Sequence, residues 1–190
     1  MKEVFDFEIQ PQGAISQAFL ARAIFTFFEA AAFIQHLPYG RNTNKNDLLS
    51  VFDEGKGTCS TKHAVLKQLA IEQNFDQLKL IMGIFKMNSI NTPLIASTLT
   101  QYKLSYIPEA HMYLSYKGER LDFTRVNSSA ADFQDDLLEE CEIQPDEITE
   151  VKVGKHQLFI ENWLVETHQI PYSLKELWSI REQCILDLSV

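Results

Sequence analysis

Hydrophobic residues recur along the chain at spacings that predict alternating helical and extended segments. Between Ser16 and about His36 the apolar positions follow the period of an α-helix, and Ser16 is the candidate N-cap. Arg22 and Glu29 interrupt this run well short of the ~18 uncharged residues that a membrane span requires. We therefore expect one buried helix over this segment.

A second helix is predicted from Cys59 to about Asn74, with Thr58 as its N-cap. The run 78–87 is apolar on both faces, which is typical of a central strand covered on two sides. Residues 5–9 alternate between apolar and acidic side chains. This alternation predicts an edge strand or an extended arm.

The rest of the chain combines a hairpin with helices. Two strand-like segments, 110–116 and 120–124, flank Lys117-Gly118 and predict a β-hairpin. Further helices are predicted over 47–52, 92–102, 130–141, 155–168 and 173–186, the last with a capping box of Ser173 and Glu176. We expect a single α+β domain over residues 1–190, with a core at about 14–126 and a C-terminal helical layer at about 128–190. That layer is expected to pack over the sheet or to form one wall of a cleft.

The net charge of the chain indicates which classes of binding partner are disfavoured. Seventeen basic and twenty-six acidic residues give a net charge of −9. This balance disfavours a nucleic-acid backbone or an anionic membrane surface as the main partner. A neutral or cationic substrate fits the charge better. Much of the acidic charge lies in 132–150, which we interpret as a solvated surface.

Three cysteines, Cys59, Cys141 and Cys184, form an odd set without a C-x-x-C pair. This pattern predicts free thiols in a reducing compartment and offers no zinc framework. Cys141 and Cys184 lie on apolar faces of predicted helices and are interpreted as inert core thiols. The acidic N-terminal residues do not resemble a signal peptide, so we expect a cytoplasmic protein.

Cys59 is the strongest candidate for chemistry because it lies at a predicted helix N-terminus. The N–H groups of a first helical turn and the helix macrodipole stabilise a thiolate, which is the reactive form of cysteine. A cysteine nucleophile also needs a base and a carboxylate that orients the base. His111 and Asp122, one on each strand of the predicted hairpin, can supply these groups.

The register of the hairpin tests whether His111 can reach Asp122. With a two-residue turn, Tyr116 faces Glu119, and the same register places Tyr113 opposite Asp122. His111 then becomes a diagonal neighbour of Asp122 at roughly 7–8 Å between backbones, within side-chain reach. A loop with an odd number of residues would place Asp122 on the opposite face.

The order of these residues matches a known pattern. Gly57-Thr58-Cys59 opens a helix, His111 follows in a strand, and Asp122 stands beside Phe123 and Thr124 in the next strand. This G-x-C, H, D-x-T order resembles the transglutaminase-like superfamily of papain-like cysteine folds, in its small bacterial form, over about residues 37–126. The chain departs from the animal enzymes at Ser60, where they carry an aromatic residue, and no calcium-loop pattern is present.

The resemblance implies a nucleophile helix packed on an antiparallel sheet, with N-terminal and C-terminal helices around them. It also implies that Cys59, His111 and Asp122 form a catalytic triad for a protease, an amidase or an acyltransferase. The substrate would be a peptide or protein amide, or a small amide, and no cofactor or metal is required. An oxyanion hole would combine the Cys59 N–H with a second donor from the 39–46 loop or Ser60, and we name Tyr39, Asn42 and His63 as cleft candidates.

Several alternatives stay open. His63 lies one helical turn after Cys59 and could replace His111 as the base, although a packing role suits a helical neighbour better. His36, His156 and His168 are expected in surface or capping roles. A non-catalytic module that binds a peptide or protein is an alternative function, favoured by Ser60. An arylamine acetyltransferase type of enzyme ranks last, because Lys56-Gly57-Thr58 replaces its R-G-G-x-C lead-in.

Overall fold

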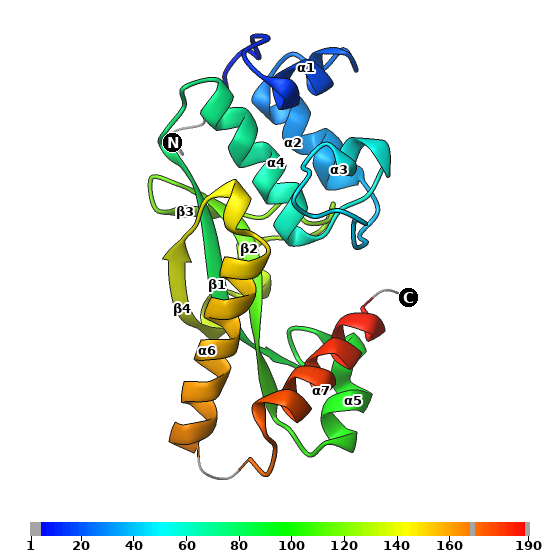
Figure 1. Cartoon of the computed structure of the whole chain (residues 1–190), viewed down its shortest axis with the longest axis vertical. Coiled ribbons are helices and arrows are strands. Elements are labelled where there is room, and N and C mark those ends of the chain that lie inside the picture. Colours follow the sequence, from blue (N-terminus) through cyan, green and yellow to red (C-terminus); the bar gives the residue numbers. More distant parts are fainter. Residues whose placement is uncertain (1–4, 168–169, 189–190) are drawn as a thin grey trace. The chain divides into compact units, whose positions relative to one another are not determined.

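A computed structural model describes residues 5–167 and 170–188 of the chain (Figure 1). Four strands form one antiparallel sheet in the order β3-β2-β1-β4. The strands are β1 (Leu78–Asn88), β2 (Tyr106–Tyr116), β3 (Glu119–Leu121) and β4 (Leu137–Glu142). The α-helices are α1 (Ala14–Leu20), α2 (Phe27–His36), α3 (Ser50–Asp53), α4 (Cys59–Glu72), α5 (Ala96–Gln101), α6 (Glu150–Thr167) and α7 (Leu174–Asp187). The expected mixture of helices with an antiparallel sheet is confirmed.

The chain divides into two compact units, and each unit is assembled from three segments. Unit 1 comprises Met1–Ile81, Met112–Ala130 and Glu142–Thr149. Unit 2 comprises Met82–His111, Ala131–Cys141 and Glu150–Val190. The long strands β1 and β2 therefore contribute residues to both units.

The first predicted helix is wrong in one respect, because two helices replace it. α1 ends at Leu20, Ala23 takes a left-handed conformation with φ of 56°, and α2 begins at Phe27. Thr26 and Glu29 form a capping box that starts the second helix, with Glu29 Oε2 accepting from the Thr26 backbone N–H at 3.1 Å. The interruption leaves backbone groups of residues 25–27 free to pair with the N-terminal arm.

The N-terminal arm lies in the extended conformation predicted for residues 5–9. The Ile9 N–H donates to the Phe25 carbonyl at 2.7 Å, and the Phe27 N–H donates to the Phe7 carbonyl at 3.0 Å. Phe5 is buried against Phe27 and Tyr116, at ring-centroid distances of 5.1 Å and 4.3 Å. These rings form an aromatic core for unit 1.

Ser16 is not the N-cap of α1. The cap is Gly13, whose N–H donates to the Ser16 hydroxyl at 2.8 Å, and the Glu72 carboxylate accepts from the N–H groups of Ile15 and Ser16.

We expect Glu72→Ala to lower the free energy of unfolding by about 0.5–2 kcal/mol, because two N–H groups of the first turn lose their acceptor. Urea unfolding measures the change. Glu8→Ala removes an exposed carboxylate from the same unit and should have a smaller effect.

The hairpin has the register that the sequence predicts. Tyr116 pairs with Glu119, and Leu114 pairs with Leu121, around a two-residue turn in which Lys117 and Gly118 both have positive φ. The second strand is shorter than expected, because β3 ends at Leu121. Asp122 therefore follows the strand and does not take part in the ladder.

The predicted helix over 130–141 is wrong. This segment contains two short 3-10 turns and then the strand β4, which is hydrogen-bonded next to β1 in the sheet. Cys141 consequently lies on a strand and is half-buried. The run 137–142 contains good helix formers, but pairing with a sheet edge outweighs local propensity.

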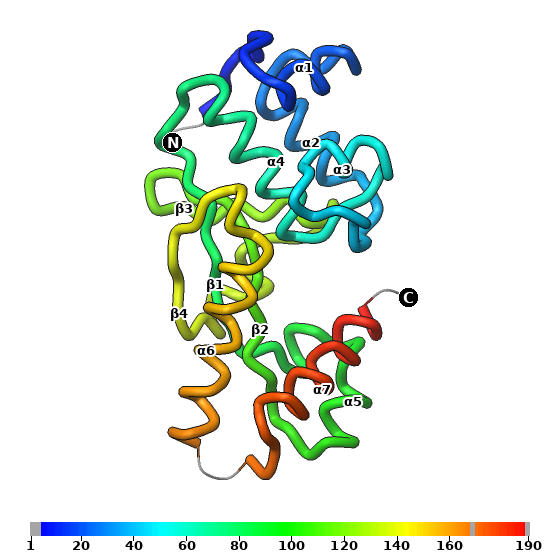
Figure 2. Tube along the Cα trace, viewed as in Figure 1, coloured from blue at the N-terminus to red at the C-terminus, as the bar shows by residue number. Residues whose placement is uncertain are grey.

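Helices α5, α6 and α7 belong to unit 2. α5 and α7 lie side by side although they are far apart in the sequence, and their courses can be followed in green and red in Figure 2. α6 packs on the part of β2 that belongs to the same unit, where Trp163 Nε1 donates to the Tyr106 hydroxyl at 2.8 Å. The predicted capping box of Ser173 and Glu176 is confirmed at the start of α7.

His156 does not have the surface or capping role expected for it. Only 2% of the side chain is exposed, and Nε2–H donates to the Pro108 carbonyl at 2.9 Å. Burial, the largest effect, lowers the pKa of His156 below its ordinary value although Glu109 opposes the shift. His36 is exposed and bonds to the Ala32 carbonyl in the last turn of α2, as expected of a capping role, and His168 lies outside the described residues.

Within the described ranges, no helix combines the length and apolar character needed to cross a bilayer.

Candidate functional site

Cys59 is the first residue of α4, as the sequence predicts. Thr58 caps the helix, and its backbone N–H donates to the Thr61 hydroxyl at 3.0 Å in a capping box. Only 8% of Cys59 is exposed. The thiol therefore lies at the positive end of a helix of 14 residues, in a largely desolvated position.

Gly57 gives the chain room to enter this helix. A Cβ at position 57 would lie 2.9 Å from Lys62 Cγ and 2.9 Å from Thr61 Oγ1, which is closer than side chains pack. The Gly57 N–H also donates to the Pro38 carbonyl at 3.1 Å, and its carbonyl accepts from the Gly40 N–H at 3.2 Å. Position 57 thus requires glycine, because the side chains of Thr61 and Lys62 in the first turns of α4 lie too close to leave room for a Cβ.

Lys62 is fully buried in the first turn of α4. Its ammonium donates to the Leu37 carbonyl at 2.5 Å and to the Thr124 carbonyl at 2.7 Å. Burial is the largest effect on this group and, together with the charge of Arg125, lowers the pKa of Lys62 to about 8. The charges of Asp122 and Cys59 act in the opposite direction and favour the ammonium form.

Asp122 lies beside His63. Its Oδ1 accepts from the Thr124 N–H at 2.8 Å and lies 3.5 Å from His63 Nε2. Both side chains are buried, with 3% and 0% of their surfaces exposed. The carboxylate of Asp122 therefore faces His63, the alternative base named from the sequence. Asp122 lies after the end of β3, so the pairing of the hairpin strands does not fix its position.

The hydrogen bonds of His63 define its protonation state. Nε2 accepts from the Phe123 N–H at 2.8 Å, so this nitrogen carries no proton. Nδ1 lies 2.8 Å from the Cys59 carbonyl and must be the protonated nitrogen that donates to it. Both ring nitrogens of the neutral imidazole thus bind backbone groups, which is the packing role expected of His63.

His111 belongs to unit 2, whereas Cys59 and Asp122 belong to unit 1. The His111 ring is half-buried and packs against Phe133 and Phe85, at ring-centroid distances of 4.9 Å and 6.2 Å. The proposed triad of Cys59, His111 and Asp122 stays a prediction.

The four oxyanion and cleft candidates, which include His63, lie in unit 1. Asn42 is buried, its amide donates to the carbonyls of Lys56 and Ser50, and its Oδ1 accepts from the Thr61 hydroxyl at 2.8 Å. The Tyr39 ring lies under the Arg125 guanidinium, 4.7 Å from the ring centroid. Ser60 is buried as the second residue of α4. Asn42 thus braces the loop before α4, with its amide hydrogens on backbone acceptors.

Thr124, the last residue of the D-x-T motif, is unusual. Its hydroxyl oxygen is buried and finds no hydrogen-bond partner within residues 5–167 and 170–188. Buried hydroxyl groups nearly always have a partner. The carbonyl of the same residue accepts from Lys62.

No family model, no curated protein and no solved structure matches this chain.

The other two cysteines differ from Cys59. Cys184 is fully buried on α7, and burial raises the pKa of its thiol to about 12. This agrees with an inert core thiol. Cys141 lies on β4 and not on a helix, and all three cysteines are free thiols.

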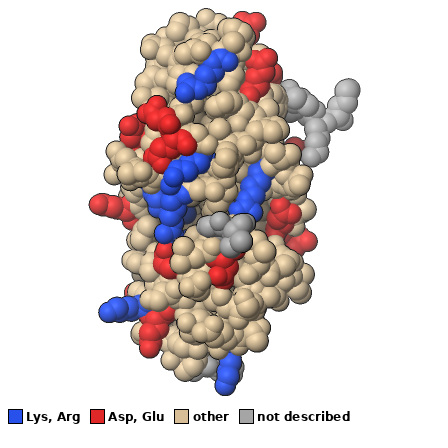
Figure 3. Space-filling view, turned by 90° about the vertical axis from the view of Figure 1, so that its right-hand side faces the viewer, with Lys and Arg blue, Asp and Glu red and all other residues tan. Residues whose placement is uncertain are grey.

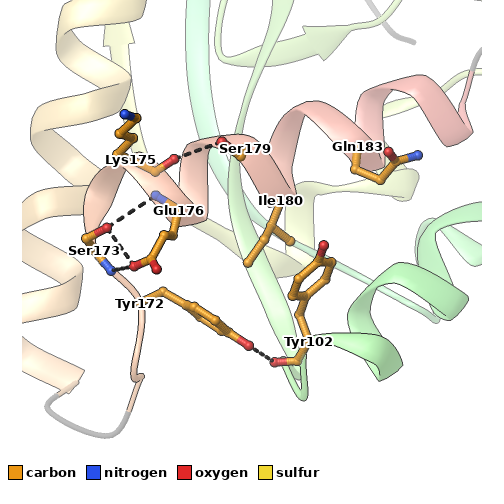
Figure 4. Close-up of a pocket in the computed structure, with 8 residues that line it drawn as sticks. All are labelled: Tyr102, Tyr172, Ser173, Lys175, Glu176, Ser179, Ile180 and Gln183. Atoms are coloured by element: carbon orange, nitrogen blue, oxygen red, sulfur yellow. Dashed lines mark hydrogen bonds between the residues drawn. The ribbon is translucent and has the colours of Figure 1, made fainter.

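A cavity of about 630 Å³ opens in unit 2, and its residues were not predicted as a site. Figure 4 shows Tyr172 and Tyr102 beside Ile180, with the Tyr172 hydroxyl donating to the Tyr102 carbonyl at 2.9 Å. Lys175, Glu176 and Gln183 also line it. Glu176 accepts from Ser173 in the capping box, so this carboxylate serves the helix start.

Lys, Arg, Asp and Glu side chains are interspersed on the face drawn in Figure 3. Among the residues whose positions are described, no group of three or more His, Cys, Asp and Glu side chains is arranged to hold a metal ion. The buried lysine at position 62 is the main feature that the sequence interpretation missed. A lysine three residues after Cys59 gives no sign of burial, since most lysines are exposed.

Proposed function

We propose that this protein is a cysteine-dependent enzyme that acts on an amide bond, with Cys59 as nucleophile, His111 as base and Asp122 as the group that orients the base. The observation that carries the proposal is the position of Cys59 as the first residue of α4. The helix N-terminus stabilises negative charge on the thiol.

The hydrogen bonds of His63 support the choice of His111 as the base. His63 donates to the Cys59 carbonyl and accepts from the Phe123 N–H, so neither ring nitrogen is available to take the thiol proton without breaking a backbone hydrogen bond. His111 is the remaining histidine of the G-x-C, H, D-x-T order.

In the proposed reaction, His111 takes the thiol proton and the Cys59 sulfur forms a bond to the carbonyl carbon of the amide. The C–N bond then breaks, and the leaving amine receives the proton from His111. The thioester that results is resolved by water in a protease or amidase, or by a second amine in an acyltransferase. The Cys59 N–H is proposed as one oxyanion donor.

The first test is alkylation of the native protein by iodoacetamide across about pH 5–9, with peptide masses locating the modified cysteine. We expect Cys59 to react faster than Cys141 and to keep reacting at the acid end. His111→Ala should slow the reaction at about pH 6 by roughly tenfold or more, because a shift of one unit in the thiol pKa changes the thiolate fraction about tenfold.

His36→Ala is the matched control, since it removes an exposed histidine from the end of α2. Labelling of Cys59 at the rate of Cys141, unchanged by His111→Ala, would overturn the enzyme proposal.

A non-catalytic binding module is the second candidate. The contacts of Asp122 with the Thr124 N–H and of His63 with backbone groups favour it, because they give these residues structural roles without catalysis. This candidate expects Cys59→Ser to retain every cellular function, whereas the enzyme proposal expects a loss. The three free cysteines support a reducing compartment, and we propose a cytoplasmic location.

A further inference from the structure

Lys62 is an unusual residue to bury. Lysine is almost never fully buried unless it is paired, and the charge of a desolvated ammonium costs stability. Lys62 nevertheless has no exposed surface, and its two hydrogen-bond acceptors are neutral backbone carbonyls. A methionine of similar length would fill the same space without a charge to desolvate. The positive charge at this position therefore needs an explanation beyond packing.

The charged groups around Lys62 explain why a positive charge is buried at this position. It lies three residues after Cys59 on α4, a spacing that places two side chains on the same helix face. The ionised forms of Asp122 and Cys59 favour the ammonium form of Lys62, and the cation Arg125 opposes it. His63, the next residue of the helix, accepts from the Phe123 N–H through Nε2 and lies 3.5 Å from Asp122 Oδ1.

The hydrogen bonds of Lys62 have a second effect. They join the first turn of α4 to Leu37, at the end of α2, and to Thr124, two residues after Asp122. An ammonium has three donors, and these two carbonyls accept two of them. The same group thus contributes charge near Cys59 and fixes the segment that carries Asp122.

We propose that Lys62 is a positioning residue of the Cys59 site, whose buried ammonium holds Cys59 in the thiolate form and anchors the 122–124 segment. This inference rests on the proposed function. Burial alone would keep Cys59 as a neutral thiol, because a low dielectric disfavours the charged form. A cation in the same desolvated region offsets that effect more strongly than it would in water. With a pKa of about 8, Lys62 still carries its charge at neutral pH.

The test compares the pH profile of Cys59 alkylation in the intact protein and in Lys62→Met. We expect the profile to move to higher pH by about one unit or more, so that the rate at about pH 6 falls roughly tenfold. Lys62→Arg, which retains the charge, should restore most of the rate. Lys67→Met is the matched control, because Lys67 is a buried lysine of the same helix that donates to the Leu78 carbonyl at 2.6 Å.

Each outcome has a separate meaning. If Cys59 of the unaltered protein reacts as slowly as Cys141, the proposed function fails and the inference fails with it. If Cys59 is reactive and Lys62→Met leaves its profile unchanged, the inference alone is overturned. Thermal unfolding checks that each variant is folded, and Lys62→Gln, which keeps a donor without the charge, replaces a methionine variant that does not fold.

Discussion

Arg181→Met is expected to lower the free energy of unfolding by about 3–5 kcal/mol, because it leaves a buried carboxylate without its counter-charge. Arg181 Nε donates to Glu109 Oε2 at 2.7 Å, and Nη2 donates to the other oxygen. Only 11% of the arginine side chain and 9% of the glutamate side chain are exposed. Urea unfolding of the purified variant measures the loss.

Two controls separate the buried charge from other effects. The double variant Glu109→Leu with Arg181→Met removes both buried charges and should recover much of the lost stability, since the other partner of Arg181, Glu182, is 34% exposed and can be solvated. Lys79→Met breaks the pair with Glu142, whose side chains are 54% and 39% exposed, and should cost about 0–1 kcal/mol. A double variant as unstable as Arg181→Met would contradict the explanation.

The same pair implies a dependence on pH. Burial alone would raise the pKa of Glu109, but the charge and hydrogen bonds of Arg181 outweigh it, and the pKa lies below its ordinary value of 4.5. A carboxyl group whose pKa is lowered by folding contributes stability above its ordinary pKa. That contribution should be lost as the pH falls below about 4.5 and through the lower pKa of the folded state.

Phe27→Ala is expected to lower the free energy of unfolding by about 3–5 kcal/mol, the usual cost of removing a buried aromatic ring. Phe27 has no exposed surface, and its ring packs against Phe5 and Phe7, each at a centroid distance of 5.1 Å. Urea unfolding gives the size of the change. Phe25→Ala, at a side chain that is 55% exposed, should change it by less than about 1 kcal/mol.

The sequence predicted the helices and strands whose positions depend on neighbouring residues, such as a helix cap or a two-residue turn. A capping residue before an apolar run located the start of α4 at Cys59, and the two-residue turn determined the register of the hairpin. The continuous apolar run over 78–87 predicted β1, which has neighbours on both sides in the sheet. In each case, the nearest residues in the sequence carry the information.

The features that the sequence did not predict depend on distant segments. The 130–141 segment has helical propensity, but β4 gains hydrogen bonds by pairing with β1. The helix predicted from Ser16 to His36 is interrupted at a point where residues 7–9 pair with residues 25–27. The approach of Asp122 to His63 joins residues that are far apart in the sequence, and no helical or strand period indicates it.

The segmentation of the chain limits how this protein can be divided or could have been assembled. The backbone passes from one unit to the other five times, after Ile81, His111, Ala130, Cys141 and Thr149. No single truncation point can therefore release either unit with all its segments. An end-to-end fusion of two genes would give two contiguous blocks, which differs from the interleaved pattern of these units.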